Sequence, residues 1–403
     1  MRVLDFSKVL AGPTCTQYLA DMGADVIKVE PVGGGDDTRA FPPFASKDGY
    51  ADGTIFLSAN RNKRSIGVDL KRAEGRALVH RLVERSDIVV ESFGPGVARR
   101  LGVDGETLSA INPRLIHCSI SGYGSVGELR GGKGYDAVLQ AFTGMMAITG
   151  ERGGKPVRSP FSPVDQATGM HALSGILAAV IERQNTGKGM RIEASLFDTS
   201  LAFLGYILQG VWQTGEEPQK PGSSHDSLCP YEVFDTADKP VLLGVANDSL
   251  WQKFCVVTGA HALLDDGRLA TNASRVAHRE QTVESVAAIL KSKTRDEWLA
   301  VFQAGGVPCS PVHTPSEMLE HPHTAASGMV GSYEHPVFGE TKTVAQPLRL
   351  NGKRSEVTAP APVLGQHTRD LLREMGVSPD EIAALHADKT IVTADIGNTA
   401  PIV

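Results

Sequence analysis

Short apolar runs alternate with longer mixed stretches through the first half of the chain. Runs of strand length occupy Arg2–Phe6, Asp25–Val29, Ile88–Val90, Leu115–Ser119 and Arg191–Ser195. Strands that alternate with helix-length segments are typical of βαβ units, in which each crossover returns the chain to the same sheet in parallel. The pattern therefore predicts a parallel sheet with helices on both faces.

Helical patterns fill the segments between these runs. The predicted helices are Thr14–Met22, Ala73–Glu84, Asp136–Ala147, Thr168–Gln184 and a helix from about Asp198. The fourth of them stops at Asn185-Thr186-Gly187, because glycine readily adopts the left-handed conformation that ends a helix.

The composition changes at Thr214–Gly222, a polar stretch with two prolines that we take as a domain boundary. Beyond it, residues 222–325 are predicted to form a smaller α+β domain. Its predicted strands and helices are Tyr231–Phe234, Pro240–Val245, Ser249–Val257, Arg279–Ser292 and Thr294–Gln303.

The last part of the chain, residues 326–403, is predicted to return to the large domain. It would do so through residues Thr343–Leu348 and a helix at Thr368–Glu374, with a loose tail from Ala394. The predicted fold class is α/β: a large Rossmann-like parallel-sheet domain begun by residues 1–213, and a smaller α+β domain.

Composition narrows the class of protein. With 403 residues, 41% of them hydrophobic, the chain can build two or more domains with a substantial core. A formal net charge of −6, with lysine and arginine spread along the chain, argues against nucleic-acid binding, which needs a concentrated basic face. No apolar leader follows Met1-Arg2, and no run of about 18 apolar residues offers a membrane span. We therefore expect a cytoplasmic protein.

The five cysteines are odd in number, widely separated and not arranged as C-x-x-C. This spacing predicts neither a disulfide framework nor a zinc cluster, and no metal site is expected. The cysteines are Cys15, Cys118, Cys229, Cys255 and Cys309.

One acidic residue, Asp165, stands at the start of a long run of small and apolar residues, Ala172–Ile181. Such an aspartate either accepts backbone N–H bonds as a helix cap or acts as a reactive carboxylate, and the local pattern alone favours the cap. Gly33–Gly35 follows a predicted strand, but the G-x-G-x-x-G pattern of dinucleotide-binding loops is missing, which disfavours a Rossmann dehydrogenase.

Short motifs along nearly the whole chain occur in an order typical of one enzyme family. They are Val3–Phe6, Val9–Pro13, Gly23–Glu30, Gly33–Arg39, Asn62–Ile66, Ser92–Gly96, Ser121–Gly124, Gly134–Asp136, Gly187–Gly189, Pro230-Tyr231, Asn247-Asp248, Gly306–Pro308 and Leu364–Thr368. In these motifs the chain resembles the family III CoA-transferases. Asn62-Lys63-Arg64 alone could either shape a site or end a loop.

The resemblance implies an enzyme that moves CoA from an acyl-CoA to a carboxylic acid through an aspartyl-CoA thioester, with Asp165 as the nucleophile. It also implies an interlocked homodimer, with CoA esters as substrates and no permanently bound cofactor. Residues at positions that bind CoA or the acyl group in the family are Leu10, Ala11, Val68, Lys71, Ser92, Phe93, Gly94, Arg100, Lys133, Tyr135, Asp136 and Leu196.

Departures from the family pattern bear on the substrate. Leu10 and Pro31 stand where formyl-CoA transferases carry glutamine and arginine, which disfavours oxalate and formyl-CoA. Gly222–Ser227 occupies the place of a loop that closes over the active site in the family, or is an ordinary surface turn. The stretch from Gly222 to Tyr231 is closer to transferases that use succinyl-CoA with dicarboxylates.

Two other functions stay open. The α-methylacyl-CoA racemases share the fold and use a histidine in a Gly-His-Asp motif, which reads Gly134-Tyr135-Asp136 here. Tyrosine, with a side-chain pKa of about 10, is a poor replacement for an imidazole base. His171 either supplies that base or packs within its helix. A noncatalytic CoA-ester-binding protein is the third alternative, and the presence of Asp165 argues against it.

Overall fold

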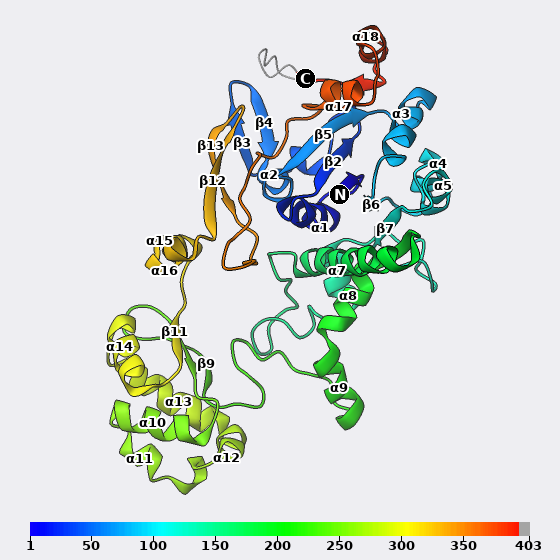
Figure 1. Ribbon diagram of the computed structural model, residues 1–403. Helices are drawn as coiled ribbons and strands as arrows, with labels where there is room; N and C mark the ends of the chain where they lie inside the picture. The colour runs from blue at the N-terminus through cyan, green and yellow to red at the C-terminus, as the bar shows by residue number, and fades with distance from the viewer. Residues whose placement is uncertain (395–403) are drawn as a thin grey trace. The chain divides into compact units, whose positions relative to one another are not determined.

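The computed structural model describes residues 1–394, which form two compact units (Figure 1). The large unit comprises Met1–Thr143, Ser159–Gln209 and the described residues from His323 onward, and the small unit comprises Gly144–Arg158 and Gly210–Pro322. Most of the predicted loose tail, residues 395–403, lies outside the described part of the chain.

The segment Gly144–Arg158 belongs to the small unit, although we had expected it in the large domain. Backbone contacts explain this placement. The carbonyl oxygen of Gly150 accepts the N–H of Gly222, and the carbonyl oxygen of Gly154 accepts a hydrogen bond from Lys220 Nζ. The segment is therefore bonded to the polar stretch at which the small unit begins.

In the described residues, the centre of the large unit is a seven-stranded sheet with the order β14-β5-β2-β1-β6-β7-β8. Its strands are β1 Arg2–Asp5, β2 Asp25–Glu30, β5 Lys63–Val68, β6 Ile88–Glu91, β7 Ile116–Ser121, β8 Met190–Ser195 and β14 Ile391–Val392. The pairs are parallel, except that β14 runs antiparallel to β5. The prediction of a large, mostly parallel sheet is confirmed, although β5 and β14 were not predicted.

The strand order reverses between β1 and β6. From β1 the chain adds β2 and β5 on one side of the sheet, and then β6, β7 and β8 on the other. The connections diverge at this point and leave a crevice at the carboxyl ends of β1 and β6. Open α/β sheets bind their ligands at such a reversal.

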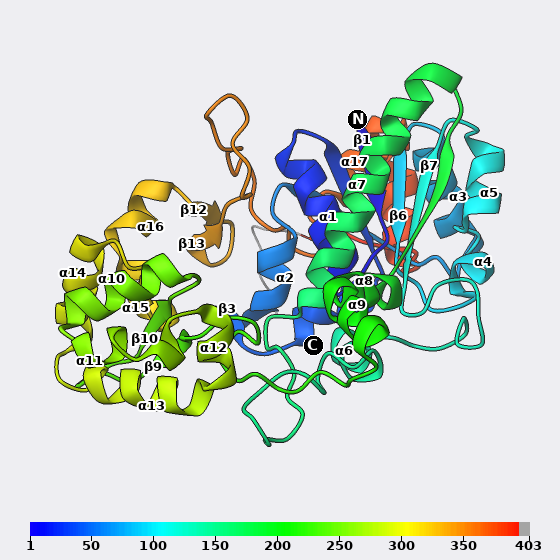
Figure 2. The ribbon, with the colours of Figure 1, turned by 90° about the horizontal axis from the view of Figure 1, so that it is seen from below.

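Helices cover both faces of the sheet, as predicted. On one face α1, Ala11–Asp21, lies beside α7, Pro163–Thr186, and on the other lie α3, Ala73–Val83, and α5, Gly105–Ile111 (Figure 2). The apolar strand residues are buried between these layers. In the described residues α7 is the one helix long and apolar enough, by composition, to cross a membrane. Here it packs against α1, β7 and β8, as a sheet-covering helix does.

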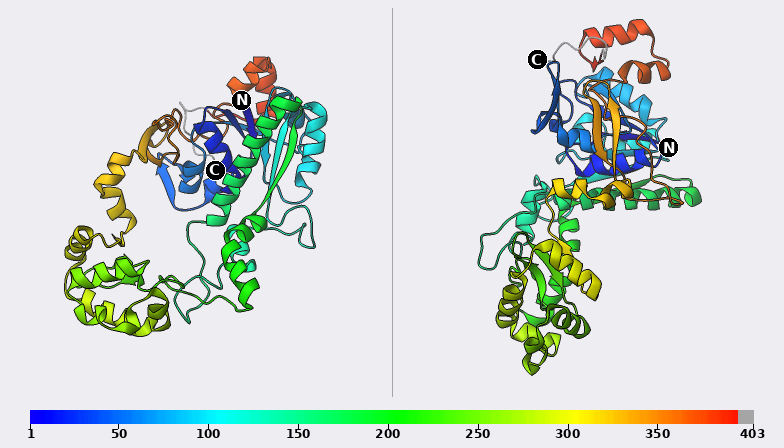
Figure 3. Two further views of the ribbon diagram at one scale, coloured as in Figure 1. Left: turned by 60° about the horizontal axis from the view of Figure 1, so that its bottom comes forward. Right: turned by 90° about the vertical axis from the view of Figure 1, so that its left-hand side faces the viewer.

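The end of the chain completes the core of the large unit. The helices α17, Thr368–Glu374, and α18, Pro379–Ala387, contribute Leu371, Leu372 and Leu385 to the same core cluster as the central strands. Figure 3 shows this last segment, in red, beside the blue and cyan elements of the large unit.

The other elements of the large unit surround the sheet. They are the 3₁₀-helix η1 Asp37–Ala40, β3 Phe44–Lys47, β4 Tyr50–Gly53, α2 Thr54–Ala59, α4 Val97–Leu101, α6 Asp136–Phe142, α8 Leu196–Phe203, β12 Val330–His335 and β13 Gly339–Val344. Of the returning segment Thr343–Leu348, the first two residues end β13, which pairs with β12 in a hairpin. The helix predicted to reach Ala147 ends at Phe142, shortly before Gly144 adopts a positive φ of 91°.

The small unit has a three-stranded antiparallel sheet and a group of helices, an α+β arrangement. Its elements are β9 Tyr231–Phe234, β10 Val241–Gly244, α10 Asp248–Thr258, α11 His261–Leu264, the 3₁₀-helix η2 Gly267–Leu269, α12 Asn272–Ala277, α13 Arg279–Leu290, α14 Arg295–Gly305, β11 Cys309–Pro311 and α15 Pro315–Glu320. Stacked aromatic rings of Trp251, Phe254, Trp298 and Phe302 fill its core. The helices α9, Gly205–Thr214, and α16, Pro322–Ser327, cross the limits between the units.

Candidate active site

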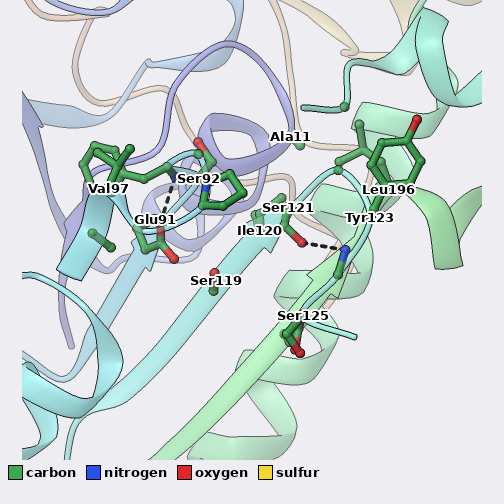
Figure 4. Close-up of a pocket in the computed structure, with 18 of the residues that line it drawn as sticks. Ala11, Glu91, Ser92, Val97, Ser119, Ile120, Ser121, Tyr123, Ser125 and Leu196 are labelled. Carbon is green, nitrogen blue, oxygen red and sulfur yellow. Dashed lines mark hydrogen bonds between the residues drawn. The ribbon is translucent and has the colours of Figure 1, made fainter. Parts of the chain in front are cut away.

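A cavity of about 1020 Å³ opens in the large unit at the carboxyl ends of β1, β6, β7 and β8. Its wall includes Lys8–Ala11 after β1, Ser92–Ala98 after β6, Ser121–Ser125 at the end of β7, and Leu196 after β8. Figure 4 shows the side chains from the ends of these strands around the opening. The cavity therefore lies at the reversal of strand order, and its volume is at the upper end of the range for small-molecule sites.

Most of the predicted site residues line this cavity. They are Leu10, Ala11, Ser92, Phe93, Gly94, Lys133, Tyr135, Asp165 and Leu196. These residues come from distant parts of the sequence and meet because the parallel strands end at one edge of the sheet.

Four predicted site residues are not in the cavity wall. Val68 is buried in the core at the end of β5, and Lys71 lies exposed in the loop that follows. Arg100 is exposed on α4, although Val97, Ala98 and Arg99 of that helix do line the cavity. Asp136 is buried against the start of α7. Contacts between these four residues and CoA stay predictions.

The helix α7 begins at Pro163 rather than at Thr168, so Asp165 lies in its first turn. Ser162, the residue before the start of the helix, has a left-handed backbone and makes no side-chain capping bond. Proline suits the first position because its missing N–H is one that the helix cannot use. The sequence pattern missed this start because the apolar run begins only several residues later.

Asp136, not Asp165, caps the first turn of α7. Its Oδ2 accepts the N–H of Val164 at 2.8 Å and the N–H of Asp165 at 3.2 Å. The Gln140 side chain donates to its other oxygen and accepts the N–H of Ser159, which ties α6 to the segment entering α7. Asp165 is therefore free of the capping role that the local pattern favoured, and its side chain faces the cavity.

Two effects raise the pKa of Asp165 from 3.8 to about 7: burial, and the nearby negative charge of Asp136. Burial makes the larger contribution, since removal of water disfavours the charged form of the carboxyl group. The negative charge of the second carboxylate disfavours the same form. A carboxyl group with such a shift in a cavity wall is typical of a functional site.

Replacing Asp136 with asparagine is expected to lower the pKa of Asp165, because one of the two causes of its rise is removed. The carboxylate is the nucleophilic form of an aspartate, so for any activity that depends on Asp165 the ascending limb of the pH profile of kcat/KM should move to lower pH, by roughly one unit. Profiles of the variant and the unmodified protein between about pH 5 and 9, roughly two units on either side of the shifted value of about 7, measure the displacement. A limb that stays in place, or moves to higher pH, would show that Asp136 does not act on Asp165 electrostatically.

The helices α1 and α7 approach closely at Gly169, one turn after Asp165. A Cβ at Gly169 would lie 2.5 Å from the carbonyl oxygen of Ala11, so only glycine fits without movement. Residues four positions apart share a helix face, which places Asp165 on the face of α7 that meets the start of α1. Sequence reasoning missed this contact, although a glycine inside a helix is itself a signal of close packing.

Charged residues in the strands of the large unit were also missed. Lys63 and Arg64 do not end a loop but begin β5, where Lys63 pairs with Asp5 at 2.9 Å. On the cavity wall, Glu91 accepts the N–H of Phe93 at 2.8 Å, and burial raises the pKa of its carboxyl group. Charged residues inside strands resemble loop residues unless their partners, on other strands, are known.

The loop Gly222–Ser227 is bonded to its own unit. Arg279 Nη2 donates to the carbonyl oxygens of His225, Asp226 and Leu228, and the N–H of Ser227 donates to His225 Nδ1. These bonds favour the surface turn over a freely mobile segment. Contact between this loop and a substrate stays a prediction.

The histidine considered for racemase chemistry lies outside the cavity wall. His171 is on α7, where its Nδ1 is 3.0 Å from Thr199 Oγ1. The residue is exposed, and its position outside the cavity wall disfavours a catalytic role. Within residues 1–394, no group of three or more His, Cys, Asp and Glu side chains is arranged to hold a metal ion.

Comparison with known proteins extends this description. The sequence profile of CoA-transferase family III matches residues 1–368. An acyl-CoA transferase from Fusarium pseudograminearum is 39% identical over 398 residues, covering 97% of this chain and 87% of that protein. A succinate–glutarate CoA-transferase from Agrobacterium fabrum is 38% identical over 378 residues, covering 93% and 94%. The crystal structure of a CAIB/BAIF family protein from Brucella suis superposes with a TM-score of 0.84 at 34% identity, covering 93% of this chain and 98% of that one.

Proposed function

The chain belongs to CoA-transferase family III, and we propose that it moves CoA from succinyl-CoA, or a related short-chain ester, to a carboxylic acid through a thioester of Asp165. The observation that carries the proposal is the desolvated carboxylate of Asp165, with its pKa raised to about 7, in the wall of a large cavity. The succinate–glutarate transferase among the relatives supports a dicarboxylic acid as acceptor.

Asp165 can conserve the energy of the thioester bond. Its carboxylate attacks the acyl carbonyl, so that a mixed anhydride forms and the CoA thiolate leaves. The thiolate then attacks the aspartyl carbonyl, which releases the donor acid and leaves CoA on Asp165. The acceptor carboxylate attacks this aspartyl thioester and expels the thiolate, which finally attacks the acceptor's carbonyl in the second anhydride. The product is the acceptor's CoA ester and free Asp165.

The cavity wall supports these steps by limiting access of water. Leu10, Ala11 and Leu196 bring apolar surface to the cavity that Asp165 faces, and an anhydride there is protected from hydrolysis when the substrates fill the space. Cationic side chains farther along the wall, Arg99 and Lys133, suit the phosphates of CoA. The predicted phosphate contacts of Lys71 and Arg100 belong to this proposal as well.

We further propose that two chains form a homodimer, interlocked as the family resemblance implies. Large apolar side chains support this association: Phe203 is 44% exposed on α8, and Tyr206 and Trp212 are 83% and 70% exposed on α9. Large apolar side chains exposed to this degree are typical of protein contacts. A cytoplasmic location and the absence of a permanent cofactor stay predictions.

Trapping the intermediate tests the function. The enzyme is incubated with succinyl-CoA and no acceptor, treated with hydroxylamine or borohydride, and digested for mass spectrometry. We expect modification of the peptide that contains Asp165, none at Asp136, and new CoA esters when a panel of dicarboxylates is added.

Labelling at Asp136, or full transfer without any labelling, would contradict the assignment of the nucleophile. Deuterium exchange at the α-carbon of a branched acyl-CoA, without transfer, would instead identify a racemase.

A further inference from the structure

Val9, in the loop between β1 and α1, has a left-handed backbone with a φ of 68°. A β-branched residue rarely adopts this conformation, because its Cβ crowds the neighbouring carbonyl group, so surrounding contacts must hold it there. Val9 and the next two residues, Leu10 and Ala11, form the part of the cavity wall that follows β1. The strain therefore lies at the edge of the candidate active site.

A buried ion pair holds this loop. Oδ1 of Asp36 accepts the N–H of Val9 at 3.3 Å, and Oδ2 of the same carboxylate lies 2.9 Å from Lys28 Nζ. Both side chains are completely buried, with 0% exposure. Lys28 Nζ also donates to the carbonyl oxygen of Ser7 at 2.9 Å, so the pair binds the loop at two points.

Neighbouring contacts leave the loop little room to move elsewhere. The N–H of Lys8 donates to Ser92 Oγ at 2.9 Å, which joins the loop to the segment after β6. A Cβ at Gly12 would lie 2.2 Å from the Cβ of Ser7, so the loop folds tightly onto the first turn of α1. A change at Val9 is therefore transmitted to Leu10 and Ala11.

We propose that Asp36, supported by Lys28, is a positioning residue for the transfer reaction. It does not line the cavity itself. It holds Val9 in the left-handed conformation and so fixes the wall of Leu10 and Ala11 relative to the nucleophile on α7. This role rests on the proposed function, because it assigns Asp36 to the geometry of that reaction.

A cycle of variants tests the proposal. Asp36→Ala should lower kcat by about 10²-fold, the usual consequence of a displacement of about 1 Å, with a smaller change in KM. Adding Val9→Gly to Asp36→Ala should restore kcat by roughly tenfold, because glycine adopts positive φ without a side-chain penalty. The matched control is Val9→Ala in the same background, which removes the contacts of the two γ-methyl groups but keeps the Cβ and with it a backbone penalty at positive φ. Asp36→Asn, which keeps an oxygen for the Val9 N–H, should retain more activity than Asp36→Ala.

Hydrogen exchange of the peptide spanning residues 7–12 gives a readout independent of catalysis. Asp36→Ala should speed exchange there, and Val9→Gly, but not Val9→Ala, should slow it again. If the unmodified enzyme transfers no CoA, the proposed function fails, while the exchange data still decide whether Asp36 holds the loop.

Equal rescue by glycine and alanine, or unchanged exchange in a folded Asp36→Ala variant, would overturn the proposal. If Asp36→Ala does not fold, Lys28→Met with Asp36→Leu removes both buried charges together, a change that proteins tolerate better than an unpaired charge. The same comparison of Val9→Gly with Val9→Ala is then made in that background.

Discussion

Asp165→Asn is expected to reduce CoA transfer by roughly 10⁴-fold or more, the order of loss seen when a covalent nucleophile is removed. Asparagine has nearly the same size and leaves the first turn of α7 intact, but its amide cannot form the anhydride or the aspartyl thioester. Binding of the CoA ester should persist, because the rest of the cavity wall is unchanged. Steady-state transfer and calorimetric binding of CoA measure the two effects separately.

Asp198 offers a matched control for this substitution. It is an exposed aspartate at the third position of α8, as Asp165 is at the third position of α7, and it lies outside the cavity wall. Asp198→Asn removes the same favourable interaction with a helix N-terminus, so its activity should stay close to that of the unmodified enzyme. Comparable losses in the two variants, or substantial turnover by Asp165→Asn, would remove Asp165 from the mechanism.

Gly169→Ala is expected to lower kcat by about 10²-fold while the protein stays folded. The new Cβ would lie 2.5 Å from the carbonyl oxygen of Ala11, so α1 and α7 must move apart. Because Asp165 is on one helix and Ala11 begins the other, the separation changes the geometry of the reacting groups, and a misplacement of about 1 Å has an effect of this size. Overpacking should also cost about 1–3 kcal/mol of unfolding free energy. Kinetics and denaturant unfolding on the same preparations measure both quantities.

The control on the same helix is Gly175→Ala. Its Cβ would lie 3.1 Å from a side-chain methyl group of Ile192, rather than 2.5 Å from a backbone oxygen, so both activity and stability should change much less. A Gly169→Ala enzyme with unaltered kcat would mean that the contact between α1 and α7 does not set the position of Asp165.

The strands that sequence predicted best are those with at least two closely spaced apolar residues. β1, β2, β6 and β7 are mostly buried, and their apolar residues indicate this without reference to any partner. β5 was missed because it begins with Lys63 and Arg64, whose carboxylate partners Asp5 and Asp25 lie on other strands. A window of sequence reports burial only when the buried residues are apolar. The two residues of β14 are too few to produce a pattern.

The same distinction applies to the candidate site, of which one part could be predicted from the sequence and another could not. The position of Asp165 could be predicted, because the motifs around it resemble a known family. Its environment could not, because the cap on α7 comes from Asp136, 29 positions earlier, and the contact at Gly169 comes from the start of α1. The cap and the contact at Gly169 both depend on contacts between separate helices. The sequence pattern within either helix does not predict such contacts.

The position of β14 at the edge of the sheet has a consequence for biosynthesis. β5 pairs with Ile391–Val392, and the N–H of Gly67 donates to Thr368 Oγ1, 301 positions later. Until Ile391 and Val392 have been synthesised and have left the ribosome, that side of β5 stays unpaired. β1 and β2 leave the exit tunnel much earlier. The small unit ends before this segment begins, so it can fold during the wait. A chain that terminates prematurely before Ile391 keeps an open strand edge, the surface through which sheet proteins aggregate.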